Sequence, residues 1–196
     1  FVGSEMFEKT LGIIGLGRIG GLVATRMKAF GMKLVAYDPY ISDERFKRYG
    51  CEKAKTLDEL LEKADVITIH TPKTKETVDM INAENIHKLK DGVRLVNAAR
   101  GGLFNEEAVA EGLRSGKIAS FGYDVHTVEP RSECILYEFE NAITTPHIGA
   151  TTYEAQRNVG TQVVKQVLNG LRGEIVETAV NLPAIGREEF LIVKPF

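Results

Sequence analysis

The chain has 196 residues, with 25 basic and 27 acidic side chains and a formal charge of −2 at neutral pH. This length fits one domain and part of a second. Folding at this size buries about 70% of the surface of the unfolded chain, so stabilisation by disulfides or metals is not required. The balanced charge argues against nucleic acid or an anionic membrane as a partner. Cys51 and Cys134 lack the spacing of metal ligands, so we expect reduced thiols, no metal and a cytoplasmic protein.

The sequence contains neither a recognisable membrane span nor a leader peptide. No apolar run approaches the roughly 18 residues that cross a bilayer, and residues 1–9 lack the pattern of a signal peptide. We therefore expect a soluble protein that does not bind membranes. The chain begins with Phe1 rather than Met and reaches its first predicted strand almost at once, so we expect a fragment or a processed product.

Short apolar runs predict six β-strands, and helical patterns separate these runs along the chain. This alternation is typical of βαβ units. We predict an α/β fold of the Rossmann type, a doubly wound parallel sheet with helices on both faces. The predicted strands are Leu11–Ile14, Lys33–Tyr37, Val66–Ile69, Val93–Val96, Ile118–Tyr123 and Ala142–Thr144.

Capping residues and apolar spacing predict the helices. The first is Arg18–Phe30, with apolar side chains at helical spacing. A second begins in the capping box Thr56–Glu59, and a third follows the capping residue Asn105. The last and longest helix is predicted to start at Thr151 or Thr152.

The domain organisation follows from these elements. We predict that residues 1–173, including the long last helix, form a dinucleotide-binding domain. Residues 174–196 are too few to build a second core, and their pattern changes to apolar runs such as Ala179–Pro183. We predict that they begin the return of the chain to a substrate domain whose main body lies outside this sequence.

A glycine-rich loop joins the first predicted strand to the first predicted helix. Gly15, Gly17 and Gly20 have the Gly-x-Gly-x-x-Gly spacing, which is weak evidence alone but stronger between a strand and a helix. Gly15 allows the tight turn, Gly17 lets backbone approach a pyrophosphate, and Gly20 permits close packing of helix on sheet. We expect the amides of Arg18 and Ile19, at the positive end of the helix dipole, to hold the phosphates.

Residues that follow two further predicted strands are candidates for the rest of the cofactor site. Asp38 lies 18 residues beyond Gly20, where a carboxylate can accept hydrogen bonds from both adenosine ribose hydroxyls and repel a 2′-phosphate. NAD is therefore favoured over NADP, although Asp38 and Pro39 could also simply form a turn. Thr71 and Pro72 follow the third predicted strand and form either a chain reversal or a cofactor contact, which we assign to Thr71.

Three polar side chains predict the chemistry. Arg100 follows the fourth predicted strand, and its guanidinium can clamp a substrate carboxylate with two charge-assisted hydrogen bonds; a surface salt bridge is the alternative. His147 follows the sixth predicted strand, and its imidazole can take a hydroxyl proton as a hydride leaves the same carbon. Glu129 can fix the imidazole tautomer and stabilise its charged form. Asp124, at the end of the fifth strand, is a candidate acceptor for the nicotinamide carboxamide.

These motifs together resemble those of the D-2-hydroxyacid dehydrogenases. The resemblance covers residues 1 to about 183, and His126 departs from it, because that family usually has an aromatic or aliphatic residue there. The motifs that carry it, in the order of that family, are Gly15–Gly20, Tyr37–Pro39, His70–Pro72, Asn97–Gly102, Asp124–Val125, Glu129–Pro130 and Thr145–Ala150.

The resemblance implies NAD as cofactor, a small 2-hydroxy acid as substrate, and the roles given above for Arg100, Glu129 and His147. It also implies homodimers or homotetramers that pair through the cofactor domain. The motifs Glu154–Gln156 and Ala179–Asn181 are most similar to family members that oxidise 3-phospho-D-glycerate to 3-phosphohydroxypyruvate, the first committed step towards L-serine. The NAD contacts that it implies are Arg18, Ile19, Asp38, Thr71, Ala98, Ala99, Arg100, Asp124, His147, Ile148, Gly149 and Ala150.

Two other functions are compatible with the same residues. One is reduction of glyoxylate, hydroxypyruvate or D-lactate, which would use the same three catalytic side chains. The other is an NAD-sensing scaffold that resembles the C-terminal-binding corepressors and would dock peptides through the missing domain. Fold alone does not separate these functions. Because one wall of the cleft is missing, we expect this chain alone to bind NAD but to turn over little substrate.

Overall fold

The computed structural model describes residues 3–176 and 178–179 of the chain. The chain divides into two compact units, Phe1–Gly149 and Ala150–Phe196. The assignment of the long last helix to the cofactor domain stays a prediction. The predicted apolar return beyond Ala179 lies outside the described residues.

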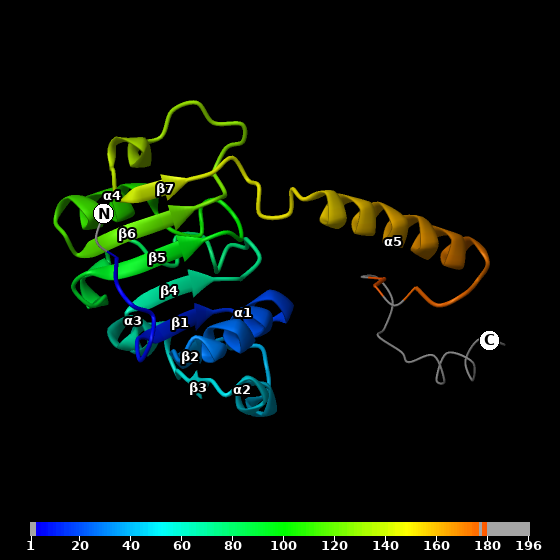
Figure 1. Ribbon diagram of the computed structural model, residues 1–196, viewed down its shortest axis with the longest axis horizontal. Helices are drawn as coiled ribbons and strands as arrows, with labels where there is room; N and C mark the ends of the chain where they lie inside the picture. The colour runs from blue at the N-terminus through cyan, green and yellow to red at the C-terminus, as the bar shows by residue number, and fades with distance from the viewer. Residues whose placement is uncertain (1–2, 177, 180–196) are drawn as a thin grey trace. The chain divides into compact units, whose positions relative to one another are not determined.

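The first unit is built on a seven-stranded parallel sheet with the order β3-β2-β1-β4-β5-β6-β7 (Figure 1). All six predicted strands are present, and the two-residue edge strand β3 was not predicted. The chain moves outward from β1 in one direction and then returns to place β4 on the other side, which creates a switch point between β1 and β4. The strands are β1 Thr10–Ile14, β2 Lys33–Tyr37, β3 Glu52–Lys53, β4 Val66–Ile69, β5 Val93–Asn97, β6 Ile118–Tyr123 and β7 Ala142–Thr144.

Capping side chains start three of the helices where the sequence predicts. Thr56, Asn105 and Thr152 each accept a hydrogen bond from a backbone amide three residues later. No helix in the described part of the chain combines the length and the apolar composition that crossing a membrane requires. The helices are α1 Arg18–Ala29, α2 Asp43–Tyr49, α3 Leu57–Lys63, α4 Glu106–Arg114 and, in the second unit, α5 Tyr153–Leu171, with short 3-10 turns at Ile86–Lys88 and Ile135–Glu138.

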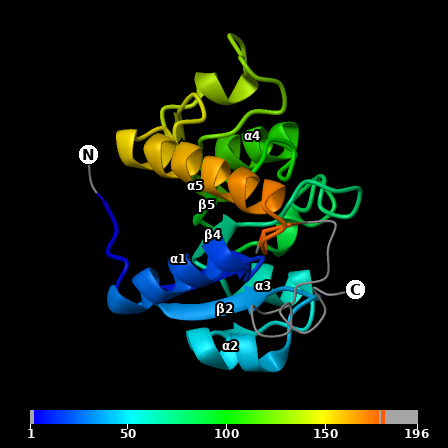
Figure 2. The same ribbon diagram turned by 90° about the vertical axis from the view of Figure 1, so that its right-hand side faces the viewer.

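Two apolar cores lie on opposite faces of the sheet. Along β1, Leu11 and Ile13 belong to the core beneath α1 and α2, whereas Ile14 belongs to the core beneath α3 and α4. This alternation follows from the two-residue period of a strand. Figure 2 shows α1 and α3 with the strands between them. The predicted Rossmann-type fold, with helices on both faces, is confirmed.

Parallel strands bring all their carboxyl ends to one edge of the sheet. The segments that follow β1, β2, β4, β5, β6 and β7 therefore meet at that edge, beside the switch point. Every predicted site residue of the first unit lies in one of these segments.

Candidate active site

The glycine loop has the geometry that its spacing predicts. Gly15 has φ +88°, and a Cβ there would lie 2.9 Å from the His70 carbonyl oxygen. A Cβ on Gly20 would lie 2.1 Å from the Gly15 carbonyl oxygen, so only glycine lets α1 start this close to the turn. A Cβ on Gly17 meets no atom within 4 Å. The requirement for glycine at position 17 therefore does not come from the protein's own packing.

The residues around this loop fit a dinucleotide. Gly17 caps α1 without a side-chain hydrogen bond, which leaves the first amides of the helix free for phosphate oxygens. Asp38 accepts the Leu16 amide at 2.9 Å, so the ribose-binding candidate also braces the loop. Oγ1 of Thr71 is buried at the switch point without a partner among the described residues, as expected for a group that a ligand would satisfy.

Replacing Gly17 by alanine is expected to weaken NAD binding by about tenfold or more, which corresponds to about 1.4 kcal/mol. The domain should fold as before, because the added methyl group meets no protein atom. Calorimetric titration with NAD and thermal unfolding measure the two effects. Gly122→Ala, whose Cβ would have only ordinary contacts at 3.8 Å, is the control that keeps both properties. An unchanged NAD affinity in Gly17→Ala would show that the pyrophosphate binds elsewhere.

Arg100 is held by a structured loop after β5. The buried Asn97 side chain donates to the Arg100 carbonyl oxygen at 2.9 Å and accepts the Ala99 amide at 3.1 Å. Gly101 packs directly on backbone, since a Cβ there would lie 1.9 Å from the His126 carbonyl oxygen. The guanidinium donates only to the Ala99 carbonyl oxygen and forms no salt bridge within the described residues. The salt-bridge alternative for Arg100 thus has no partner among the described residues, and the choice between it and a carboxylate ligand stays a prediction.

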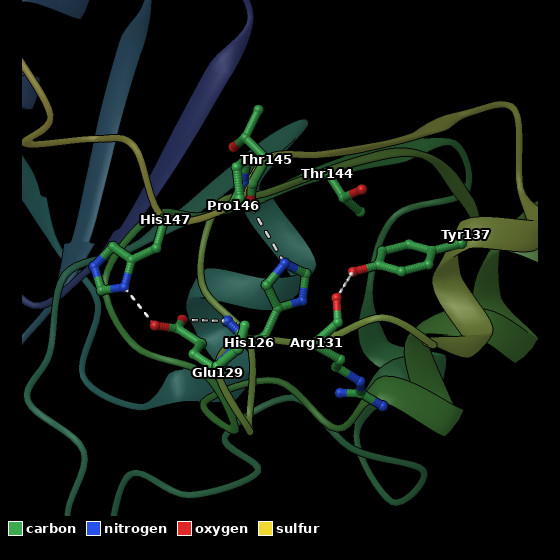
Figure 3. Close-up of a pocket in the computed structure, with 9 residues that line it drawn as sticks. His126, Glu129, Arg131, Tyr137, Thr144, Thr145, Pro146 and His147 are labelled. Carbon is green, nitrogen blue, oxygen red and sulfur yellow. Dashed lines mark hydrogen bonds and ion pairs between the residues drawn. The ribbon is translucent and has the colours of Figure 1, made fainter.

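Glu129 and His147 form a hydrogen-bonded pair, as Figure 3 shows. Oε2 of Glu129 lies 2.7 Å from Nδ1 of His147, and Oε1 accepts the His126 amide at 2.8 Å. The bond to His147 is the main reason that the pKa of Glu129 is lowered, so the carboxyl is ionised near neutral pH. The second ring nitrogen of His147 points away from Glu129 and stays available to a substrate (Figure 3).

The backbone at His147 is fixed by Asp124. His147 has φ +57°, a left-handed conformation that is uncommon for residues other than glycine but several-fold enriched for histidine. Oδ1 of Asp124 accepts the Thr145 hydroxyl at 2.6 Å and the Ile148 amide at 2.8 Å, and Oδ2 accepts the Gly149 amide at 2.8 Å. Burial raises the pKa of Asp124, but these hydrogen bonds outweigh burial and lower it overall.

This role of Asp124 was not predicted from the sequence, and its expected contact with nicotinamide stays a prediction.

Glu106 is a second residue whose role was not predicted. It lies in the first turn of α4, with 13% of its side chain exposed, and accepts hydrogen bonds from Tyr123, Thr127 and Arg131. These bonds outweigh the burial that raises its pKa, so the net pKa is lowered. Thr127 and Arg131 flank Glu129, so Glu106 anchors the loop that presents the partner of His147. From the sequence alone, a glutamate in the first turn of a helix is expected only to interact favourably with the helix dipole.

The other histidines at this edge have different environments. His70 is half-buried, desolvation lowers its pKa to about 4, and its Nε2 lies 3.0 Å from the Thr68 hydroxyl. It is therefore neutral near pH 7 and unsuited to carry a proton there. His126 is 8% exposed, with Tyr123 and Tyr137 at its ring edges, which fits its place at a position usually apolar in the family. Its Nε2 lies 3.3 Å from the Thr145 carbonyl oxygen.

Two cavities adjoin the Glu129–His147 pair. One, of about 210 Å³, is lined by Lys73, Arg100, Glu129 and His147 together with Gly101 and residues 125–127. The other, of about 230 Å³, lies between this pair and Tyr137 (Figure 3). The first cavity thus contains a guanidinium that can clamp a carboxylate and an imidazole that can move a proton.

The structure brings together the predicted site residues of the first unit at one edge. Ala98, Ala99, Ile148 and Gly149 lie in the same loops as the polar candidates, whereas Ala150 belongs to the second unit. The roles assigned to these residues stay predictions.

Comparison with known proteins identifies the family. Residues 1–149 match the model of the D-isomer specific 2-hydroxyacid dehydrogenase, NAD binding domain. The chain is 48% identical over 196 residues to D-3-phosphoglycerate dehydrogenase of Bacillus subtilis, covering all of the chain and 37% of that protein. It is 45% identical over 196 residues to the protein of the same name from Synechocystis, covering all of the chain and 35% of that protein. The chain thus spans little more than a third of the length of these relatives.

Solved structures show the same relationship. D-lactate dehydrogenase with NAD+ from Lactobacillus jensenii superposes with a TM-score of 0.83 at 31% identity, covering 92% of this chain and 58% of that one. A glyoxylate reductase from Paecilomyes thermophila gives a TM-score of 0.82 at 37% identity, covering 89% and 53%. The chain therefore belongs to the D-isomer specific 2-hydroxyacid dehydrogenases, as the NAD-binding domain of that family.

Proposed function

We propose that the chain is the cofactor-binding part of an NAD-dependent D-3-phosphoglycerate dehydrogenase, which oxidises 3-phospho-D-glycerate to 3-phosphohydroxypyruvate at the start of L-serine synthesis. The observation that carries an oxidoreductase function is the 2.7 Å bond between Glu129 and His147 beside a cavity that Arg100 also lines. The phosphoglycerate substrate is supported by relatives of that name at 45–48% identity over the whole chain. Glyoxylate reduction is the second candidate, favoured by the similar structure of that name at 37% identity.

The proposed mechanism assigns one task to each side chain. When bound at the glycine loop, NAD supplies a hydride acceptor. Arg100 binds the substrate carboxylate with two parallel hydrogen bonds and so orients the carbon that carries the hydroxyl group. Nε2 of His147 accepts the hydroxyl proton as the alcohol becomes a ketone. Glu129 holds Nδ1 protonated and stabilises the imidazolium that forms.

Asp38 is expected to set the choice between NAD and NADP. In Asp38→Ser, the preference for NAD should fall by about tenfold or more, because the carboxylate no longer accepts ribose hydroxyls or repels a 2′-phosphate. Serine retains a short acceptor for the Leu16 amide that Asp38 binds at 2.9 Å. Steady-state kcat/KM with each cofactor measures the change. Asp43→Ser, which alters an exposed carboxylate at the start of α2, should keep the original ratio, and a retained NAD preference in Asp38→Ser would contradict the assignment.

The substrate assignment is tested by assaying the full-length protein with NAD against 3-phospho-D-glycerate, D-glycerate and D-lactate, and in the reverse direction with NADH against glyoxylate. The highest kcat/KM is expected for phosphoglycerate. A higher value for glyoxylate would favour the second candidate. Binding of NAD without turnover of any of these acids would favour an NAD-sensing scaffold.

We further propose a cytoplasmic homodimer or homotetramer that pairs through the cofactor domain, which in this proposal includes α5 and extends to residue 173. The two cysteines are free and buried, which is compatible with a reducing compartment. Light scattering of the full-length protein and of residues 1–173 should give the same oligomeric state. If the full-length protein is oligomeric but residues 1–173 are monomeric, the proposed pairing through the cofactor domain is contradicted.

A further inference from the structure

Lys73 is a second cationic side chain at the candidate substrate cavity. It follows β4 at the carboxyl edge of the sheet and lines the cavity of about 210 Å³ together with Arg100, Glu129 and His147. Its Nζ lies 2.9 Å from the position that a Cβ on Gly102 would take. Gly102, at φ +81°, therefore leaves the space that the lysine side chain occupies over the Arg100 loop.

Neither cation in this cavity is paired with a carboxylate of the described residues. Within the described part of the chain, no carboxylate oxygen lies within 4.0 Å of Lys73 or Arg100. Glu129, the carboxylate that lines the same cavity, is bonded to His147 and to the His126 amide. Two positive charges that face one small cavity favour an anionic ligand there.

We propose that Lys73 binds the second anionic group of the substrate, the phosphate ester, while Arg100 binds the carboxylate. This inference rests on the proposed phosphoglycerate dehydrogenase function. A monocarboxylic hydroxy acid neutralises one cation of the cavity, whereas a hydroxy acid that also carries a phosphate ester neutralises both. The chemistry of the two side chains fits this division, because the planar arginine fork matches a carboxylate and the compact lysine ammonium binds phosphate as a point charge. Lys73 is thus a specificity-determining residue.

The test compares Lys73→Met with the unmodified full-length protein on two substrates that differ only in the phosphate. The KM for 3-phospho-D-glycerate is expected to rise about 10- to 150-fold, the equivalent of one charge-assisted hydrogen bond, with little change in kcat. The kcat/KM for D-glycerate should stay within about twofold, since D-glycerate has no phosphate that Lys73 could bind. Lys73→Arg should restore most of the affinity for phosphoglycerate.

Lys75→Met is the matched control, because Lys75 is an exposed lysine of the same loop that does not line the cavity. It should leave both substrates unaffected. If Lys73→Met leaves the KM for phosphoglycerate unchanged, the inference is overturned while the proposed function stands. A rise in the KM for NAD in place of the KM for phosphoglycerate also overturns it, since the lysine would then serve the cofactor pyrophosphate. If the unmodified protein does not discriminate between the two acids, the proposed function itself fails, and the inference with it.

Discussion

Replacing His147 by asparagine is expected to lower kcat by about 10² to 10⁴-fold, the usual contribution of a general acid or base. Asparagine cannot carry the proton, but it tolerates the left-handed backbone, at φ +57°, that alanine would strain. NAD affinity should fall far less than kcat, because the glycine loop and Asp38, which supply other predicted cofactor contacts, follow other strands. Steady-state turnover of phosphoglycerate and calorimetric titration with NAD measure the two quantities.

His87 provides the control for this substitution. It is exposed, lies in the 3-10 turn Ile86–Lys88 and does not line either cavity beside Glu129. His87→Asn should therefore keep full activity. A parallel loss of turnover and NAD affinity in His147→Asn would indicate that the substitution disturbs the cofactor site, and the assignment of the proton to His147 would fail.

Apolar runs predicted the fold because the central strands are buried on both faces. Runs such as Val66–Ile69, apolar except for Thr68, are typical of a sheet covered by helices, and the cores on either side of β1 explain why residues 11–14 are apolar or small. The strand β3 was missed because its residues, Glu52 and Lys53, are exposed and pair only at the sheet edge. Helix α2 was missed because Phe46 is its one buried side chain.

The candidate site was predictable from the sequence where its residues directly follow predicted strands. In a parallel sheet, residues that follow different strands meet at one edge, so Arg100, Glu129 and His147 could be placed together without knowledge of any contact. The supporting bonds were not predictable in this way. Glu106 reaches Arg131 25 residues away, and Asp124 reaches Gly149 at the same separation. No periodicity or short motif connects such pairs, because their contact depends on the path of two loops.

Replacing Arg100 by methionine is expected to lower kcat/KM for phosphoglycerate by about 10² to 10⁴-fold, since two charge-assisted hydrogen bonds contribute about 1.5–3 kcal/mol each. Arg100→Lys should lose about tenfold or more, because lysine keeps the charge but not the planar fork. Folding should be unaffected, since the loop is held by Asn97 and, among the described residues, the guanidinium donates only to the neighbouring Ala99 carbonyl oxygen. The measurements are substrate kinetics and thermal unfolding midpoints.

The Arg100 variants are best compared with Arg114→Met. Arg114 forms an exposed salt bridge with Glu111 on α4, and such pairs contribute about 0–1 kcal/mol. Its removal should leave both kinetics and stability nearly unchanged. If Arg100→Lys retained the full activity of the original protein, the site would need only a positive charge. The carboxylate would then not be clamped by the guanidinium fork, and the division of the two anionic groups between Arg100 and Lys73 would have to be abandoned.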